Sequence, residues 1–417
     1  MNKPLKSDLK KFFINIVTKS PRVQIFEAII KGEFRSVAQF SIDYHMSVTV
    51  IREHLKEIRK VLSYYDISIS NKKFEFKGKE EQIRMFLFLF YWRIFRGLHW
   101  PFKNIIELEL NSLVDHLVTQ GILTKPTHIE KKRILLFFAI LKLRIKKKGL
   151  SITKYNSPIS VTLEKHFSTN KKFIFFIKNS EEIFFISNIF KAFGWVEDSW
   201  IVREIDFEIE KKLPAGRATK YTLSKINSNL KKINECQLNR LTNYLFTIHT
   251  FANNFTNFSG DKNGYDYSKV CTRYTNNTQI CIEEFIDKAK VDTKLKLYEE
   301  KRFLKLHYNM MLIYISKQNM MEKKIQICLE TDLPEPVEEF LCRQISSFFR
   351  ERFNFTLTNS SGIKNYNTID ILLVTIPLEE YTTIFPNAQI IAINRDLNFI
   401  DYNNIQKVLI KISKEQI

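Results

Sequence analysis

The sequence is poor in glycine and cysteine and has no long apolar run. Only 10 of its 417 residues are glycine, and no glycine-rich phosphate-binding motif occurs. The five cysteines form no Cys-x-x-Cys pair, and their odd number argues against a disulfide scaffold or a zinc ribbon. The longest apolar runs, 85–92 and 134–141, fall well short of the ~20 residues of a membrane helix. With no signal-peptide pattern at the N-terminus, we expect a reduced, cytoplasmic protein without a metal site.

Catalytic motifs are missing as well. The sequence contains no H-E-x-x-H zinc motif and no G-x-S-x-G nucleophile motif. The carboxylates Asp206, Glu208 and Glu210 alternate along one short segment. A paired-carboxylate enzyme needs a second acid across a pocket, and nothing nearby in the sequence supplies one. We therefore expect no enzymatic activity and no cofactor.

Positive charge dominates the sequence and is unevenly distributed. The chain holds 65 Lys and Arg against 45 Asp and Glu, a formal net charge of +20. Residues 1–100 contribute +9 and residues 101–321 contribute +14, whereas residues 322–417 carry −3. The basic excess favours a polyanionic partner, nucleic acid before a membrane surface. The C-terminal part is expected to face protein partners instead.

The periodicity of apolar residues changes near residue 322. Before it, apolar residues recur mostly at helical spacing, with short exceptions at 67–76 and 173–177. After it, strand-like runs alternate with helical stretches. The strands are expected over 325–329, 355–358, 369–376 and 389–394, and the helices over 337–353 and 402–412. This alternation predicts a small α/β domain with a largely parallel sheet after a mainly helical chain.

Residues 20–44 have the pattern of two consecutive helices. Ser20 followed by Pro21 predicts the start of a helix over 21–31, which the following glycine ends. Ser36 and Gln39 predict a reciprocal capping box for a short helix over 37–44.

A tight turn at His45-Met46 leads to a long helix, capped by Ser47 and running to about Tyr65. Four apolar residues spaced by four, three and four predict its buried stripe: Ile51, Leu55, Ile58 and Leu62. The alternating segment 67–78 then predicts a β-hairpin with a basic tip. This order is typical of a winged helix-turn-helix, in which the second helix enters the major groove of DNA. The candidate DNA-binding residues are Ser47, Thr49, Arg52, Glu53, Lys56, Arg59, Lys60, Asn71, Lys72 and Lys73. Alternatively, these are ordinary amphipathic helices whose basic faces are merely solvated.

The stretch from Ser47 to Phe102 resembles the Mga/AtxA family of virulence transcription regulators of Gram-positive bacteria. The resemblance rests on the helix from Arg52 to Leu62, the hairpin, a G-x-E-x-x-x-R motif at 78–84 and the triplet Trp100-Pro101-Phe102. It implies a mainly α, multidomain fold. The implied domains are a winged helix-turn-helix over 1–102, helical phosphotransferase-regulation (PRD)-like domains over 103–212 and 213–321, and an EIIB-like α/β domain over 322–417. The family usually has a further winged helix-turn-helix before this one, for which this sequence has no room.

The resemblance also implies possible phosphorylation sites. Some members accept phosphate on histidines of the regulation-like domains. Here Lys131–Leu135 has lysine where the first such histidine would lie, and His307 is near the second position, although it can equally be a surface histidine. Cys328 matches the phosphorylated cysteine of EIIB components. Glu330 and Asp332 follow it in place of a small-residue loop, which predicts a buried strand cysteine instead.

These features predict a transcriptional regulator, an activator by resemblance, that binds double-stranded DNA by sequence or by shape. We expect a homodimer or larger oligomer, with the C-terminal domain used for association. Two alternatives stay open: a sensor or relay that contacts phosphotransferase-system proteins, and an RNA-binding antiterminator. The basic clusters 131–133 and 142–148 are either additional DNA contacts or the solvated ends of a buried helix.

Overall fold

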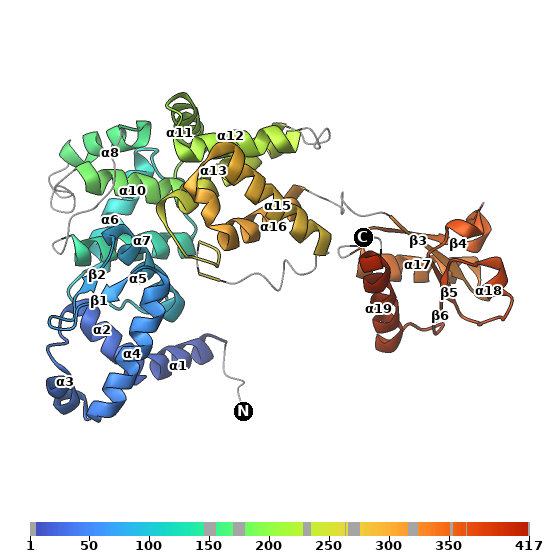
Figure 1. Cartoon of the computed structure of the whole chain (residues 1–417), viewed down its shortest axis with the longest axis horizontal. Helices are drawn as coiled ribbons and strands as arrows, with labels where there is room; N and C mark the ends of the chain where they lie inside the picture. Colours follow the sequence, from blue (N-terminus) through green and yellow to red (C-terminus); the bar gives the residue numbers. More distant parts are fainter. Residues whose placement is uncertain are drawn as a thin grey trace. The chain divides into compact units, whose positions relative to one another are not determined.

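The computed structural model describes residues 6–145, 156–169, 180–227, 235–262, 264–265, 276–315, 324–350, 353–363 and 365–415. They belong to two compact units, one formed by residues 1–266 with 286–307 and the other by 267–285 with 308–417. Figure 1 shows a mostly helical chain with a small sheet near its C-terminus. The four-domain boundaries at 102, 212 and 321 stay a prediction. The strand expected over 173–177 lies outside the described residues.

The first unit begins with a helix-turn-helix and a short hairpin. Its elements are α1 (Lys6–Thr18), α2 (Pro21–Lys31), α3 (Val37–Tyr44), α4 (Val48–Tyr64), β1 (Ser68–Ile69), β2 (Phe76–Lys77) and α5 (Glu80–Phe95). Helix α4 packs against α2 and α3, and β1 packs against α4. The three helices from residue 21 to residue 64 therefore begin and end close to where the sequence predicts them.

The rest of the first unit is helical. It contains α6 (Glu107–Thr119), α7 (His128–Arg144), α8 (Pro158–Thr169), α10 (Ser180–Phe193), α11 (Asp198–Glu210), α12 (Pro214–Asn227) and α13 (Glu235–Asn254). Helices α15 (Asn276–Thr293) and α16 (Lys301–Ile315), with the 3-10 turn η1 (Lys296–Glu299) between them, each cross from one unit to the other. Helices α5, α7 and α10 are buried over most of their surface, because they pack between neighbouring helices.

The second unit holds a four-stranded parallel sheet in the order β4-β3-β5-β6. Its strands are β3 (Ile325–Glu330), β4 (Phe355–Asn359), β5 (Ile371–Val374) and β6 (Gln389–Ala392). Its helices are α17 (Glu335–Phe349), α18 (Tyr381–Ile384) and α19 (Phe399–Glu415). All four expected strands are present, and their parallel pairing agrees with the α/β class expected for this part.

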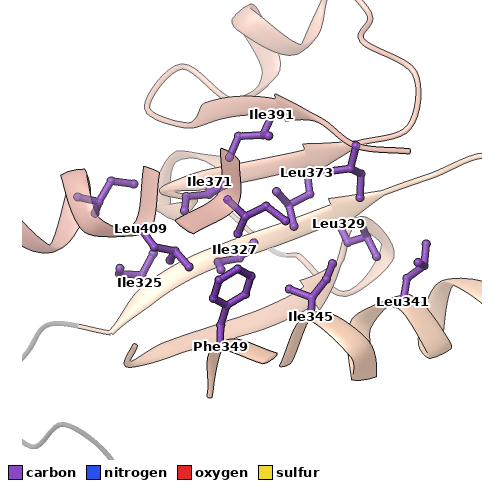
Figure 2. Close-up of a cluster of buried hydrophobic side chains, with 13 residues drawn as sticks. Ile325, Ile327, Leu329, Leu341, Ile345, Phe349, Ile371, Leu373, Ile391 and Leu409 are labelled. Atoms are coloured by element: carbon purple, nitrogen blue, oxygen red, sulfur yellow. The ribbon is translucent and has the colours of Figure 1, made fainter. Parts of the chain in front are cut away.

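One face of this sheet packs on α17 and α19. Figure 2 shows Ile325, Ile327 and Leu329 of β3 among side chains of the neighbouring elements, including Leu341, Ile345, Phe349 and Leu409. The alternate residues of the central strands face the other side of the sheet. There Cys328, Leu372 and Val374 form a second cluster with Tyr381 and Phe385. Both faces of the sheet are therefore covered, which explains why its two central strands, β3 and β5, are mainly apolar. None of the described helices is long and apolar enough to cross a membrane.

Candidate nucleic-acid interface

Helices α2 and α3 are set by their capping residues. Ser20 is the N-cap of α2 and Pro21 its first residue, but the Ser20 hydroxyl makes no capping hydrogen bond. Gly32 ends α2 in the left-handed region at φ 76°. Ser36 Oγ accepts from the Gln39 backbone N–H at 3.1 Å. The Gln39 side chain donates instead to Asp43 at 2.8 Å, so only half of the expected capping box forms.

The turn between α3 and α4 is tight. His45 adopts the left-handed conformation at φ 52° and ends α3. The Ser41 hydroxyl then donates to the Met46 carbonyl at 2.5 Å, which closes the turn. Ser47 caps α4, because its Oγ accepts from the Val50 backbone N–H at 3.3 Å. The remaining N–H groups of the first turn of α4 stay available for an anion.

Helix α4 is strongly two-faced. Ile51, Leu55, Ile58 and Leu62 are all buried, as the spacing predicts. Nearly all the candidate contact residues of this helix lie on the solvent side: Ser47, Thr49, Arg52, Glu53, Lys56 and Lys60 are exposed. Arg59 is half-buried, and its Nε makes no hydrogen bond within the described part of the chain. The helix thus presents arginine and lysine on one outer face.

Glu57 belongs to a different side of α4. It pairs with Arg22 of α2 and with His54, whose Nδ1 lies 3.2 Å from its carboxylate. The hydrogen bond from His54, with Arg22 nearby, lowers the pKa of Glu57. These exposed contacts link α2 to α4 and use neither Arg52 nor Lys56.

The hairpin is shorter than the sequence predicts. Only Ser68 and Ile69 pair with Lys77 and Phe76. Beyond them, the Ser70 N–H donates to the Glu75 carbonyl at 2.9 Å, and the Glu75 N–H donates to Ser70 Oγ at 3.0 Å. The tip residues Asn71, Lys72 and Lys73 are exposed, as expected for a wing. Phe74 has a left-handed backbone at φ 53°, and its ring packs on that of Phe34 with 4.6 Å between the centroids. This conformation ends the strand pairing early.

The G-x-E-x-x-x-R motif forms a buried ionic network. Arg84 donates to Glu80 at 3.1 Å and, through two bonds of 2.5 and 2.9 Å, to Glu182 of α10. Arg144 of α7 donates twice to Glu80, at 2.9 and 2.6 Å. All four side chains are 6% exposed or less, and their charges cancel. Gly78 is required for a different reason: at φ 138°, a Cβ would lie 2.9 Å from the Asp66 carbonyl oxygen.

This network joins the wing to the helical body. Arg144 also lies over the ring of Phe76 in β2, with 5.5 Å to the centroid. The Trp100-Pro101-Phe102 triplet belongs to the same body, since Trp100 donates to the Ile105 carbonyl at 2.7 Å and Phe102 packs on Tyr91. The sequence pointed to Glu80 and Arg84 through a family resemblance, but it did not reveal Glu182 or Arg144 as their partners.

The C-terminal end of α4 is anchored to more distant parts of the first unit. Arg302 donates to the Tyr64 hydroxyl at 2.9 Å. Asp66 accepts from the Asn257 side chain at 3.0 Å and from Thr256 at 3.3 Å. Among the described residues, the side chains at the N-terminal end of α4 make no comparable hydrogen bonds, and residues 47–50 are exposed.

Three lysines of the two basic clusters form ion pairs within the fold. Lys131 pairs with Asp115 at 2.6 Å, Lys132 with Glu107, and Lys142 with Glu109 at 2.9 Å. These three acceptors all lie on α6. The pairing favours a solvated, internally paired helix end over additional DNA contacts. The residues 146–148 of the second cluster lie outside the described residues.

His307 is enclosed. Its ring is 2% exposed and its Nδ1 lies 2.7 Å from the Tyr244 hydroxyl, so the reading of His307 as a surface histidine is wrong. Burial, with the positive charge of Lys262 nearby, holds the pKa of His307 well below its usual value.

At the carboxyl end of β3, the side chains that follow the strand contact one another and neighbouring elements. Cys328 is fully buried, and burial beside Glu330 and Glu338 raises its pKa to about 12. Glu330 accepts from the Tyr381 hydroxyl at 3.0 Å. Asp332 pairs with Arg395. The thiol is therefore protonated and closed off, which matches the expectation of a structural cysteine.

In the part of the chain that the structure describes, no group of three His, Cys, Asp or Glu side chains could hold a metal ion. The arrangement that remains is a short helix, a tight turn, a longer helix with a basic outer face and a hairpin with a basic tip. Together they define the winged helix-turn-helix class.

Residues 5–91 match the Mga helix-turn-helix domain. The chain is also similar to the anthrax toxin expression trans-acting positive regulator of Bacillus anthracis, with 26% identity over 119 residues. The aligned part covers 28% of this chain and 24% of that relative, so the chain spans about a quarter of the length of the curated protein it matches. The resemblance of the N-terminal part to Mga/AtxA-type regulators is thereby confirmed.

Proposed function

We propose that the protein is a DNA-binding transcriptional regulator of the Mga/AtxA type, acting as an activator and without enzymatic activity, in a bacterial cytoplasm. One observation carries the proposal: within an Mga helix-turn-helix domain, the outer face of α4 is basic and exposed while its apolar stripe is buried. The family match and the similarity to a positive regulator support the same conclusion.

The proposed binding mode assigns a role to each candidate residue. Arg52 is the best guanine donor, because its guanidinium can bond two acceptors on one base edge. Lys56, Arg59 and Lys60 lie further along α4 and would meet phosphates, as would Lys72 and Lys73 at the wing tip. Ser47, Thr49, Glu53 and Asn71 are the remaining candidate contacts. The alternatives of a relay and of an antiterminator gain no support, because His307 and Cys328 are both enclosed and the N-terminal module is a helix-turn-helix.

We further propose that the protein acts as a dimer or larger oligomer through its C-terminal unit. This unit exposes large apolar side chains on α17 and α19, including Phe340 at 58% and Phe399 at 79%. Dimerisation would place two helix-turn-helix domains on one duplex and multiply weak half-site affinities.

The test combines occupancy mapping with a gel-shift assay on one occupied promoter site. Arg52→Ala with Lys56→Ala should weaken specific binding by at least about 10-fold, because a guanine contact and a phosphate contact are lost. The control variant, Lys125→Ala with Lys211→Ala, removes the same charge from exposed positions away from α4. Equal binding by wild type and the α4 variant would refute the assignment of the reading helix.

A further inference from the structure

The first turn of α4 is unusual for the start of a helix. It consists of three consecutive β-branched residues, Val48, Thr49 and Val50, directly after the Ser47 cap. Such residues have a low intrinsic preference for helix, since their side chains lose freedom against the preceding turn. Val48 and Val50 are 36% and 37% exposed, and Thr49 is exposed too. Burial in the core therefore does not account for all of their methyl groups.

The same turn offers little for hydrogen-bonded base reading. None of its three side chains has the two-pronged donors or acceptors of Arg, Asn or Gln. The Ser47 hydroxyl already accepts from the Val50 N–H. Arg52 and Glu53 come one turn later. What this end of the helix presents is a set of methyl groups in nearly fixed orientations, which lose little conformational entropy on contact.

We propose that Val48, Thr49 and Val50 recognise the C5-methyl groups of thymines in the major groove. The inference rests on the proposed function and specifies its DNA: half-sites should carry thymines where the start of α4 enters the groove. The thymine methyl is the apolar feature of the major-groove edge, and residues at the start of the second helix of a helix-turn-helix reach base edges. The exposed N-terminal end of α4, whose other end is held by Arg302, fits this insertion.

The test removes methyl groups from the DNA one at a time. In a duplex from a site bound by the full-length protein, each thymine of the protected region is replaced by deoxyuridine, which lacks only the methyl. Wild type should lose about 4-fold in affinity at each contacted thymine, the effect of one buried methyl. The variant Val48→Ala with Val50→Ala should bind the thymine duplex more weakly than wild type and should lose less affinity than wild type on deoxyuridine substitution, because only the Thr49 contact remains. Alanine favours helix, so this variant keeps α4.

Val61→Ala serves as the matched control, because Val61 is also exposed on α4 but lies three turns further along. It should keep the wild-type response to deoxyuridine. The proposal is overturned if no deoxyuridine changes wild-type affinity, or if the Val48/Val50 variant responds to deoxyuridine as wild type does. If wild type binds every unsubstituted duplex no more tightly than scrambled DNA, the proposed function fails, and this proposal fails with it.

Discussion

Removing Glu182 should strongly destabilise the first unit. The change Glu182→Ala takes away the acceptors of both terminal nitrogens of Arg84, whose Nε still donates to Glu80, and leaves two buried arginines sharing Glu80. An uncompensated positive charge then stays in a site whose side chains are 6% exposed or less. Breaking a buried pair in this way costs about 3–5 kcal/mol. For a unit of about 290 residues, whose unfolding entropy is about 2.1 cal/mol/K per residue, that corresponds to a fall in melting temperature of roughly 5–8 °C.

The assay is thermal unfolding of the full chain followed by circular dichroism. Asp115→Ala is the control, because it breaks an exposed pair with Lys131 that contributes about 0–1 kcal/mol. Glu182→Gln should fall between the two, since it keeps the shape and one acceptor. A Glu182→Ala variant that melts within about 2 °C of wild type would show that water or rearranged side chains compensate Arg84, and the reasoning from burial would be wrong.

Two further predictions concern association and thiol reactivity. Phe340→Ser with Phe399→Ser should lower the oligomeric state measured by light scattering, whereas Phe12→Ser, an exposed phenylalanine of α1, should not; an unchanged mass would remove the association role from α17 and α19. The thiols of Cys236 and Cys281 should react with a thiol reagent at pH 8, whereas Cys328 should react only on unfolding, because burial raises its pKa to about 12 and keeps it protonated. Rapid labelling of Cys328 in the native protein would contradict its enclosure.

Local signals predicted the helix-turn-helix well. Helix starts depend on the capping residue and its immediate neighbours, and Ser36 and Ser47 make the bonds that their positions suggest. The errors arise where a second partner competes. Gln39 bonds Asp43 rather than closing the capping box, and Phe74 packs on Phe34 rather than extending the hairpin. Neither competitor can be ranked from a one-dimensional pattern.

Contacts distant in the sequence were not predictable. The lysines of α7 form what reads as a basic cluster, because their carboxylate partners on α6 come from an earlier segment. His307 gave no sign of being buried against Tyr244. The sequence pattern does not distinguish exposed valines at the start of α4, Val48 and Val50, from valines of the core. Their exposure became visible only in the fold.

The buried network also has a consequence for synthesis of the chain. Arg84 and Glu182 are 98 residues apart in sequence. At about 5–20 residues per second, a ribosome needs roughly 5–20 s to make the segment between them. During that interval Arg84 and Glu80 have neither Glu182 nor, at first, Arg144 beside them. The nascent helix-turn-helix can form its local turns early, but the attachment of its wing to the helical body is completed only after α10 has left the ribosome.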